Sequence, residues 1–102
     1  MLKIAVRTHE EEIEATTFYN WDECHKYFFS PFYDDKYIIP FRISGKTYQA
    51  KKADLRQQAI DYSNIQGVLT LYWSEVAEIS NFFERNGKRY GLLKEFRENG
   101  IC

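Results

Sequence analysis

Residues 18–37 read FYNWDECHKYFFSPFYDDKY and hold nine of the eighteen aromatic residues of the chain. Asn20 predicts the start of a helix, because its side chain can accept a hydrogen bond from the free N–H groups of a first turn. On such a helix Trp21, Cys24 and Phe28 fall on one face, so we expect these three side chains in the hydrophobic core. The stretch therefore predicts a short helix that packs against the rest of the chain.

The aromatic residues outside that helix face are candidates for binding. Pro31 ends the helix, since the residue before a proline avoids helical geometry. Large aromatic side chains in the irregular segment that follows either fold back as a lid, which is the alternative for Phe32, or form a contact patch at the surface. The candidate protein-interaction residues are Tyr27, Phe32, Tyr33 and Tyr37.

Two strands are predicted before this helix. Apolar residues alternate with less apolar ones in LKIAVR, residues 2–7, which is typical of a strand. Residues 13–19, IEATTFY, are rich in β-branched and aromatic side chains and favour a second strand. A helix over 9–17 stays open as the alternative, because Thr8 and Glu11 have the spacing of a capping box.

The chain after residue 35 predicts further strands. Residues 36–43 and 46–51 flank a serine-glycine turn and together favour a β-hairpin. Pro40 cannot donate to a strand ladder, so we expect its strand to lie at an edge of the sheet or to carry a bulge. Residues 67–73, GVLTLYW, form a nearly continuous apolar run, which is typical of a strand covered on both faces.

Three more helices are predicted from capping residues and helical spacing. Asp54 is expected to cap a helix that runs to about residue 63, and Ser74 is expected to cap the next one. Gly100 closes the last helix, with Ile101 placed to contact Phe96 as in a Schellman motif. The predicted inward-facing residues are Leu55, Ala59 and Tyr62, then Val76, Ile79 and Phe83, and finally Leu92, Leu93 and Phe96.

Residues 84–93 have two interpretations. Asn86-Gly87 either ends a helix at a left-handed residue, which gives a helix pair, or forms the turn of a β-hairpin. Local sequence does not choose between them.

These elements predict an α+β fold with a single domain over residues 1–102. We expect a mixed or mostly antiparallel sheet of about four to five short strands, with three to four short helices packed on it. The sequence has no linker or low-complexity segment that would mark a domain boundary.

Composition narrows the class of protein. No segment is apolar for long enough to form a signal peptide or a membrane-spanning helix, so no membrane partner is expected. The two cysteines, Cys24 and Cys102, are too few for a disulfide framework. We therefore expect a cytoplasmic protein.

Motifs for catalysis or cofactor binding are weak. SGKT at residues 44–47 matches the end of a P-loop, but Pro40 stands where that loop needs a glycine. The histidines and cysteines lack the spacing of a zinc site, and no nucleophile has an evident base beside it. The sequence therefore predicts a protein that is not an enzyme and that holds no metal and no cofactor; the residues considered were His9, Cys24, His25 and Cys102.

Charge supports an alternative function in nucleic-acid binding. The first third of the chain is acidic, whereas the segment 36–56 is basic. Residues 74–98 could also form a helix-turn-helix. Against this, Phe83 stands four residues before Gly87, where the tight turn needs a small residue, and several glutamates would face phosphate. The candidate nucleic-acid-binding residues are Lys51, Lys52, Arg89, Lys94 and Arg97, and the opposing acids are Glu84, Glu95 and Glu98.

Aromatic and arginine side chains are those that most often anchor protein interfaces. The primary prediction is therefore a non-enzymatic protein-interaction or regulatory module, with a protein partner or self-association as a homo-oligomer. Small size without catalytic residues also suits an accessory protein of a phage or mobile element.

Overall fold

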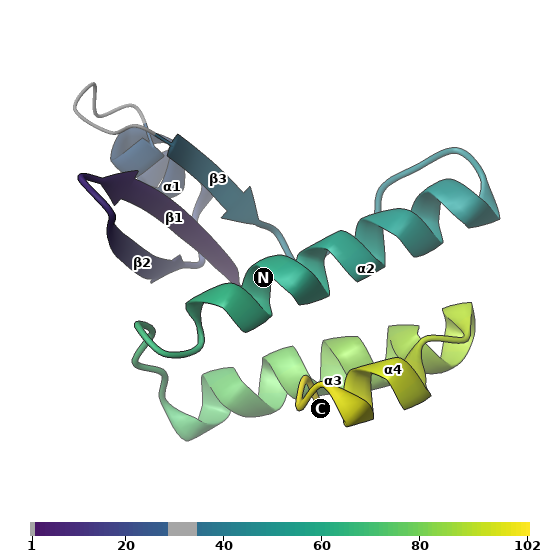
Figure 1. The fold of residues 1–102 in the computed structure, drawn as a ribbon. Helices are drawn as coiled ribbons and strands as arrows, with labels where there is room; N and C mark the ends of the chain where they lie inside the picture. Colours follow the sequence, from purple (N-terminus) through teal and green to yellow (C-terminus); the bar gives the residue numbers. More distant parts are fainter. Residues whose placement is uncertain (1, 29–34) are drawn as a thin grey trace.

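The computed structural model describes the backbone of residues 2–28 and 35–102, and the side chains of residues 2–26 and 35–102. It is an α+β fold, as predicted, with a three-stranded sheet and four helices within those residues (Figure 1). The sheet has fewer strands than the four to five expected. The elements are β1 Lys3–His9, β2 Glu12–Phe18, α1 Trp21–Phe28, β3 Asp35–Ile39, α2 Tyr48–Ile65, α3 Trp73–Tyr90 and α4 Leu93–Glu98.

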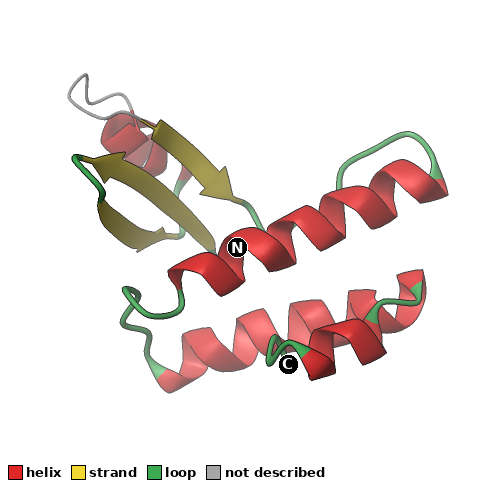
Figure 2. Ribbon diagram, viewed as in Figure 1, coloured by secondary structure: helices red, strands yellow, loops and turns green. Residues whose placement is uncertain are grey.

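The sheet is antiparallel in the order β2-β1-β3, so β1 is the central strand. Ile4 and Val6 belong to the core that the sheet shares with α2 and α3. The alternate residues point to the opposite face, where the Lys3 ammonium lies over the ring of Trp21 in α1. The sheet is thus covered by α1 on one side and by the longer helices on the other (Figure 2).

The β1–β2 connection decides the question left open for residues 9–17. Glu10 and Glu11 both have positive φ, at 48° and 70°, as a two-residue type I′ hairpin turn requires. β1 and β2 then pair in continuous register from Lys3 with Phe18 to His9 with Glu12. The predicted second strand is confirmed and the helical alternative is wrong.

An aromatic cluster centred on Phe83 joins the sheet to the helices. Phe83 is fully buried, and its ring lies 5.8 Å from the ring of Phe41 and 5.6 Å from that of Phe96, both in edge-on geometry. The rings of Tyr62 and Phe82 lie 5.8 and 5.2 Å away. These partners come from the segment after β3 and from α2, α3 and α4, so one side chain joins the three long-range neighbours of α3.

The predicted hairpin over 36–51 is wrong, although its first arm is a strand that pairs with β1. Asp35–Ile39 forms β3, but the second arm is the start of α2. Thr47 is the N-cap of that helix, because its Oγ1 accepts a hydrogen bond from the Ala50 N–H at 3.1 Å. Asp54, expected to be the cap, instead accepts from the Ser44 N–H at 2.9 Å and so holds the preceding loop against the helix.

The predicted strand over 67–73 is wrong. Residues 67–72 lie between the end of α2 and the start of α3, Trp73 is the first residue of α3, and none of them pairs with a described strand. Leu69 and Leu71 pack against the core, while Val68 and Tyr72 are exposed. The apolar run is present, but it has no neighbouring strand to pair with because both edges of the sheet lie elsewhere.

Residues 84–93 form neither a hairpin nor a helix end at Gly87. α3 continues to Tyr90 and closes at Gly91, whose φ of 72° is the left-handed value that glycine tolerates. Gly87 lies inside the helix because α4 packs on it. A Cβ atom at Gly87 would come within 3.1 Å of Phe96 Cδ2 and 3.2 Å of Leu93 Cα.

The prediction for α1 is correct for the residue at which the helix begins, but only partly correct for which side chains are buried. Asn20 caps the helix by accepting a hydrogen bond from the Asp22 N–H at 2.7 Å, and Cys24 is fully buried. Trp21, however, is 38% exposed, because its ring lies under Lys3 and edge-on to His25 at the rim of the sheet. The side chain of Phe28 lies outside the described residues.

The end of the chain follows the predicted Schellman motif. The Ile101 N–H donates to the Phe96 carbonyl at 2.9 Å, and the Gly100 N–H donates to Arg97. Ile101 is buried and joins the core. The inward face of α2 is also as expected, and Leu92 and Phe96 are buried, but Leu93 is only half-buried. α3 is capped at Tyr72 and not at Ser74, and Val76 is partly exposed. No helix of the described segments is both long and apolar enough to cross a membrane.

Replacing Phe83 with alanine should destabilise the protein by about 3–5 kcal/mol, because the substitution removes a buried ring and leaves a cavity between four elements. Chemical denaturation followed by circular dichroism measures the loss. Trp21→Ala is the matched control and should cost clearly less, since its ring is partly in water. Equal losses in the two variants would contradict the central place given to Phe83.

Candidate functional site

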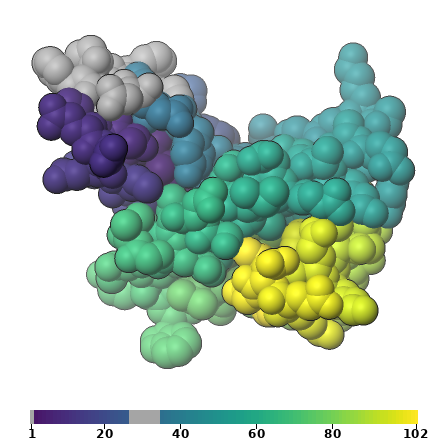
Figure 3. All heavy atoms as spheres, viewed as in Figure 1, coloured from purple at the N-terminus to yellow at the C-terminus, as the bar shows by residue number. Residues whose placement is uncertain are grey.

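A cluster of exposed apolar side chains lies where α2 is connected to α3. Trp73 is 88% exposed and Tyr72 is 80% exposed, and Val68 and Val76 lie close by in sequence with 51% and 37% exposure. We call these four residues the aromatic surface. In Figure 3 a green knob projects from the body of the molecule where α3 begins.

The way α3 begins explains why these rings lie in water. The carboxylate of Glu75 reaches back to accept the Tyr72 N–H at 3.0 Å, which fixes Tyr72 as the first cap position. Side chains in the first turn of a helix have no preceding turn to cover them. Because Glu75 and not a Ser74 hydroxyl satisfies the cap, the helix starts at Trp73 and presents the indole outward.

A shallow hollow of about 290 Å³ adjoins the aromatic surface. Leu69, Leu71 and Val76 give it an apolar lining, and Tyr62 and Gln66 of the end of α2 complete it. Leu69 and Leu71 pack against the core on their inner side. The hollow therefore adjoins Val76 of the aromatic surface and contains two leucine side chains that the core holds in place.

The surroundings of the aromatic surface are acidic. From Asp61 to Glu84 the chain carries no lysine, arginine or histidine. Desolvation, together with the nearby carboxylates of Glu75 and Glu78, raises the pKa of Tyr19, which places that 57% exposed ring beside the first turns of α3. This end of the molecule therefore combines aromatic rings with negative charge.

Of the residues predicted for protein interaction, Tyr37 is the one whose side chain the structure describes. Tyr37 is in β3, opposite Val6 of β1, and is half-buried against the core instead of lying in an irregular segment. Burial, followed by the carboxylates of Asp61 and Asp35, raises the pKa of its phenol. The side chain of Tyr27 and residues Phe32 and Tyr33 lie outside the described residues.

The predicted nucleic-acid-binding residues gather toward the opposite end of the helices. Lys51 and Lys52 are in the first turns of α2, and Arg89 is in the last turn of α3. Lys52 Nζ lies 4.0 Å from where a Cβ of Gly91 would be, so the start of α2 and the end of α3 are neighbours. Lys94 and Arg97 are exposed on α4, which Arg56 of α2 contacts through Glu95 at 3.1 Å.

Sequence reasoning missed Trp73 and Tyr72 because it assigned both to a buried strand. The available signal was Glu75, three residues after Tyr72, which is the spacing of a helix-capping glutamate. That signal places the N-cap at Tyr72 instead of Ser74, and it therefore predicts that both rings lie at the exposed start of the helix.

No protein-family model matches this chain, and neither the curated proteins nor the solved structures include a significant match to it. Among the described residues no group of three or more His, Cys, Asp or Glu side chains is arranged to hold a metal ion.

Trp73→Ala and Tyr72→Ala should leave the free energy of unfolding within about 0.5 kcal/mol of wild type, because exposed side chains contribute little to stability. Thermal and urea denaturation of both variants provides the measurement. A loss as large as that of Phe83→Ala would mean that the two rings are part of the core and not of a binding surface.

Proposed function

We propose that this protein is a non-enzymatic interaction module that binds a protein partner through the aromatic surface. The observation that carries the proposal is the exposure of Trp73, at 88%, beside an equally accessible Tyr72. Tryptophan and tyrosine are enriched among the residues that dominate binding energy in protein interfaces. Because the Trp73 indole is exposed and contributes little to the stability of the fold, it can be buried against a partner.

The partner is a protein segment with apolar and basic side chains. Its apolar residues fill the hollow beside Leu69 and Leu71 and cover the indole. Its lysine or arginine residues meet the acidic side chains of the stretch from Asp61 to Glu78, which contains no basic residue in its sequence. Guanidinium and ammonium groups also bind well to the faces of aromatic rings.

A cytoplasmic location is part of the proposal. It is supported by the two unpaired thiols, Cys24 and Cys102, which a reducing compartment preserves. Burial raises the pKa of the Cys24 thiol, against a smaller opposing effect of Lys3, so the thiol stays protonated and unreactive.

The fluorescence of Trp73 can be used to detect peptide binding at the aromatic surface. In a Trp21→Phe variant it is the sole tryptophan, so its fluorescence reveals what covers it. Peptides selected from a displayed random library against this protein should combine apolar and basic residues and should shift the Trp73 emission to shorter wavelength. Trp73→Ala should weaken their binding by about 30-fold or more, as expected for an interface anchor.

The matched control is Tyr48→Ala, which removes an exposed tyrosine from the start of α2 at the other end of the molecule. This variant should bind the selected peptides as wild type does. Selected peptides that ignore Trp73→Ala would contradict the proposal. Sedimentation in which the wild type dimerises and Trp73→Ala does not would identify a second copy of the chain as the occupant.

Nucleic-acid binding is the second candidate function, and one observation favours it. The turn between α3 and α4 is at Gly91 and not at Gly87, so the residue four before the turn glycine is itself a glycine. The spacing that a tight helix-turn-helix needs is therefore met. Two of the opposing acids also have basic partners, Glu84 with Lys88 and Glu95 with Arg56.

If this second function holds, affinity for a short DNA duplex should fall steeply with salt, since released counterions drive such binding. Lys94→Gln and Arg97→Gln should each lower the slope of log affinity against log salt by about one. Lys26→Gln, on α1 beyond the sheet, is the control and should change nothing. Fluorescence anisotropy at several salt concentrations measures the slope, and no binding at low salt would eliminate this function.

A further inference from the structure

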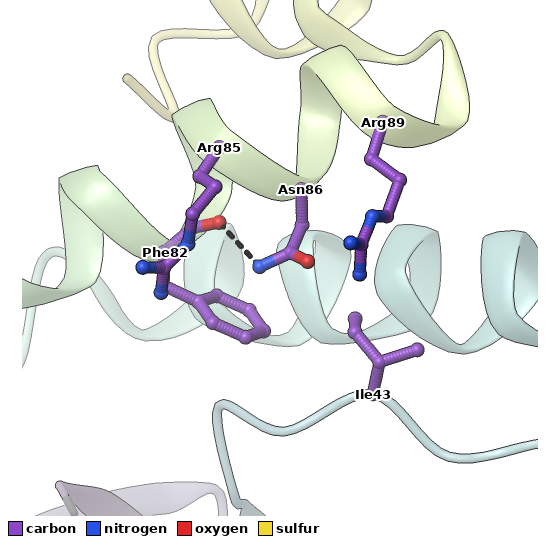
Figure 4. Close-up of a pocket in the computed structure, with 5 residues that line it drawn as sticks. All are labelled: Ile43, Phe82, Arg85, Asn86 and Arg89. Atoms are coloured by element: carbon purple, nitrogen blue, oxygen red, sulfur yellow. Dashed lines mark hydrogen bonds between the residues drawn. The ribbon is translucent and has the colours of Figure 1, made fainter.

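A separate pocket lies on the opposite half of α3, between that helix and the loop that follows β3. Its volume is about 350 Å³, and it is lined by Ile43, Phe82, Arg85, Asn86 and Arg89. Figure 4 shows the Arg89 guanidinium group reaching from α3 toward Ile43 and that of Arg85 lying beside Phe82, with the Asn86 side chain between the two. The two arginines are one helical turn apart, so they extend from the same face of the helix.

Neither arginine forms an ion pair with a described residue, although other cations of this fold do. Lys88 in the same turn of α3 lies 3.7 Å from Glu84, and Arg56 lies 3.1 Å from Glu95. Arg85 and Arg89 are both exposed and carry like charges at a spacing that is mildly unfavourable in a helix. Such a pair is stabilised by a ligand that neutralises both groups.

Two acidic residues line hollows that adjoin Arg85, and each contacts another group. Glu78 lines an adjoining hollow with Arg85, but its Oε1 accepts the Leu2 N–H at 3.3 Å. Glu84 lies on the other side of Arg85 and pairs with Lys88. No acidic residue lines the pocket itself, so its local charge is positive.

Neutral side chains form the rest of the pocket lining. Phe82 is buried and Ile43 is half-buried, and these two side chains form the apolar part of the lining beside the exposed guanidinium groups. The Asn86 amide donates to the Phe82 carbonyl at 2.9 Å, which holds it in place between the arginines. The site is thus built from fixed neutral groups and two cations.

We propose that this pocket binds a terminal phosphate group. A phosphate monoester carries up to two negative charges and three free oxygens, which match two planar guanidinium groups that each donate paired hydrogen bonds. The pocket is bounded by the loop at Ile43, which suits a single group better than a polymer backbone. The site is distinct from the aromatic surface, and it does not depend on the protein-interaction function.

The test is a titration of the full chain with inorganic phosphate, followed through the Arg side-chain Nε–Hε signals in NMR spectra, with sodium chloride at equal ionic strength as the reference. Phosphate should shift the signals of Arg85 and Arg89 in a saturable way, with a dissociation constant on the order of millimolar. Arg85→Gln and Arg89→Gln should each weaken binding by about tenfold or more. Phosphoserine and adenosine monophosphate then distinguish a phosphorylated side chain from a nucleotide as the source, and tighter binding of either one identifies it.

Lys88→Gln is the matched control, because it removes one positive charge from the same turn of α3 outside the pocket. It should bind phosphate as wild type does, and all three variants should keep the wild-type melting temperature. Signals that follow ionic strength alone would overturn the proposal, as would equal losses in Lys88→Gln and Arg89→Gln. Binding of a DNA duplex to these arginines without saturable binding of phosphate would also overturn it.

Discussion

The ring of Phe83 is the constraint on which the rest of the structure depends. It has edge-on or tilted contacts with rings from the segment after β3, from α2 and from α4, and with its neighbour Phe82. Edge-to-face packing fixes orientation as well as distance, so the cluster sets how each element lies on α3. Phe41 reaches this cluster only because its backbone adopts a φ of 49°, an unfavourable value for a bulky residue that the burial of its ring offsets.

The central strand β1 is constrained by packing on both of its faces. Because β1 is covered on both faces, its residues cannot follow a simple inside–outside alternation. Ile4 and Val6 join the main core, Ala5 is small enough to be buried on the other face, and Lys3 is 4% exposed there. The ammonium of Lys3 is satisfied by the Trp21 ring at 4.8 Å and by the Tyr19 carbonyl at 3.4 Å. A buried lysine thus explains why a tryptophan lies at the rim and not in the core.

α3 organises the surface as well as the core. Its buried face holds Ile79, Phe83 and Gly87, and its two ends present different chemistry. The first turn offers aromatic rings in an acidic stretch, whereas the last turns offer the guanidinium groups of Arg85 and Arg89. One rigid helix therefore holds a candidate protein surface and a candidate phosphate pocket at a constant separation. Binding at one end need not disturb the other.

The sequence by itself determined the features that depend on neighbouring residues. The Asn20 cap and the Schellman end at Gly100 both follow from local hydrogen bonds and backbone preferences. The inward stripe of α2, at Leu55, Ala59 and Tyr62, follows from helical spacing in the same way. These interactions connect residues within a few positions of one another, so the letters alone specify them.

Contacts between residues distant in the chain determined the features that local sequence did not predict. The segments 46–51 and 67–73 were compatible with strands, but no neighbouring strand lies where they run, and a helix start and a connection formed instead. Gly87 looked like a turn residue, and only the approach of Phe96 explains it inside a helix. Likewise Trp73 became a surface residue because no other element covers the start of α3. In each case the deciding contact comes from residues distant in the chain, and local pattern carries no information about which distant surface will be present.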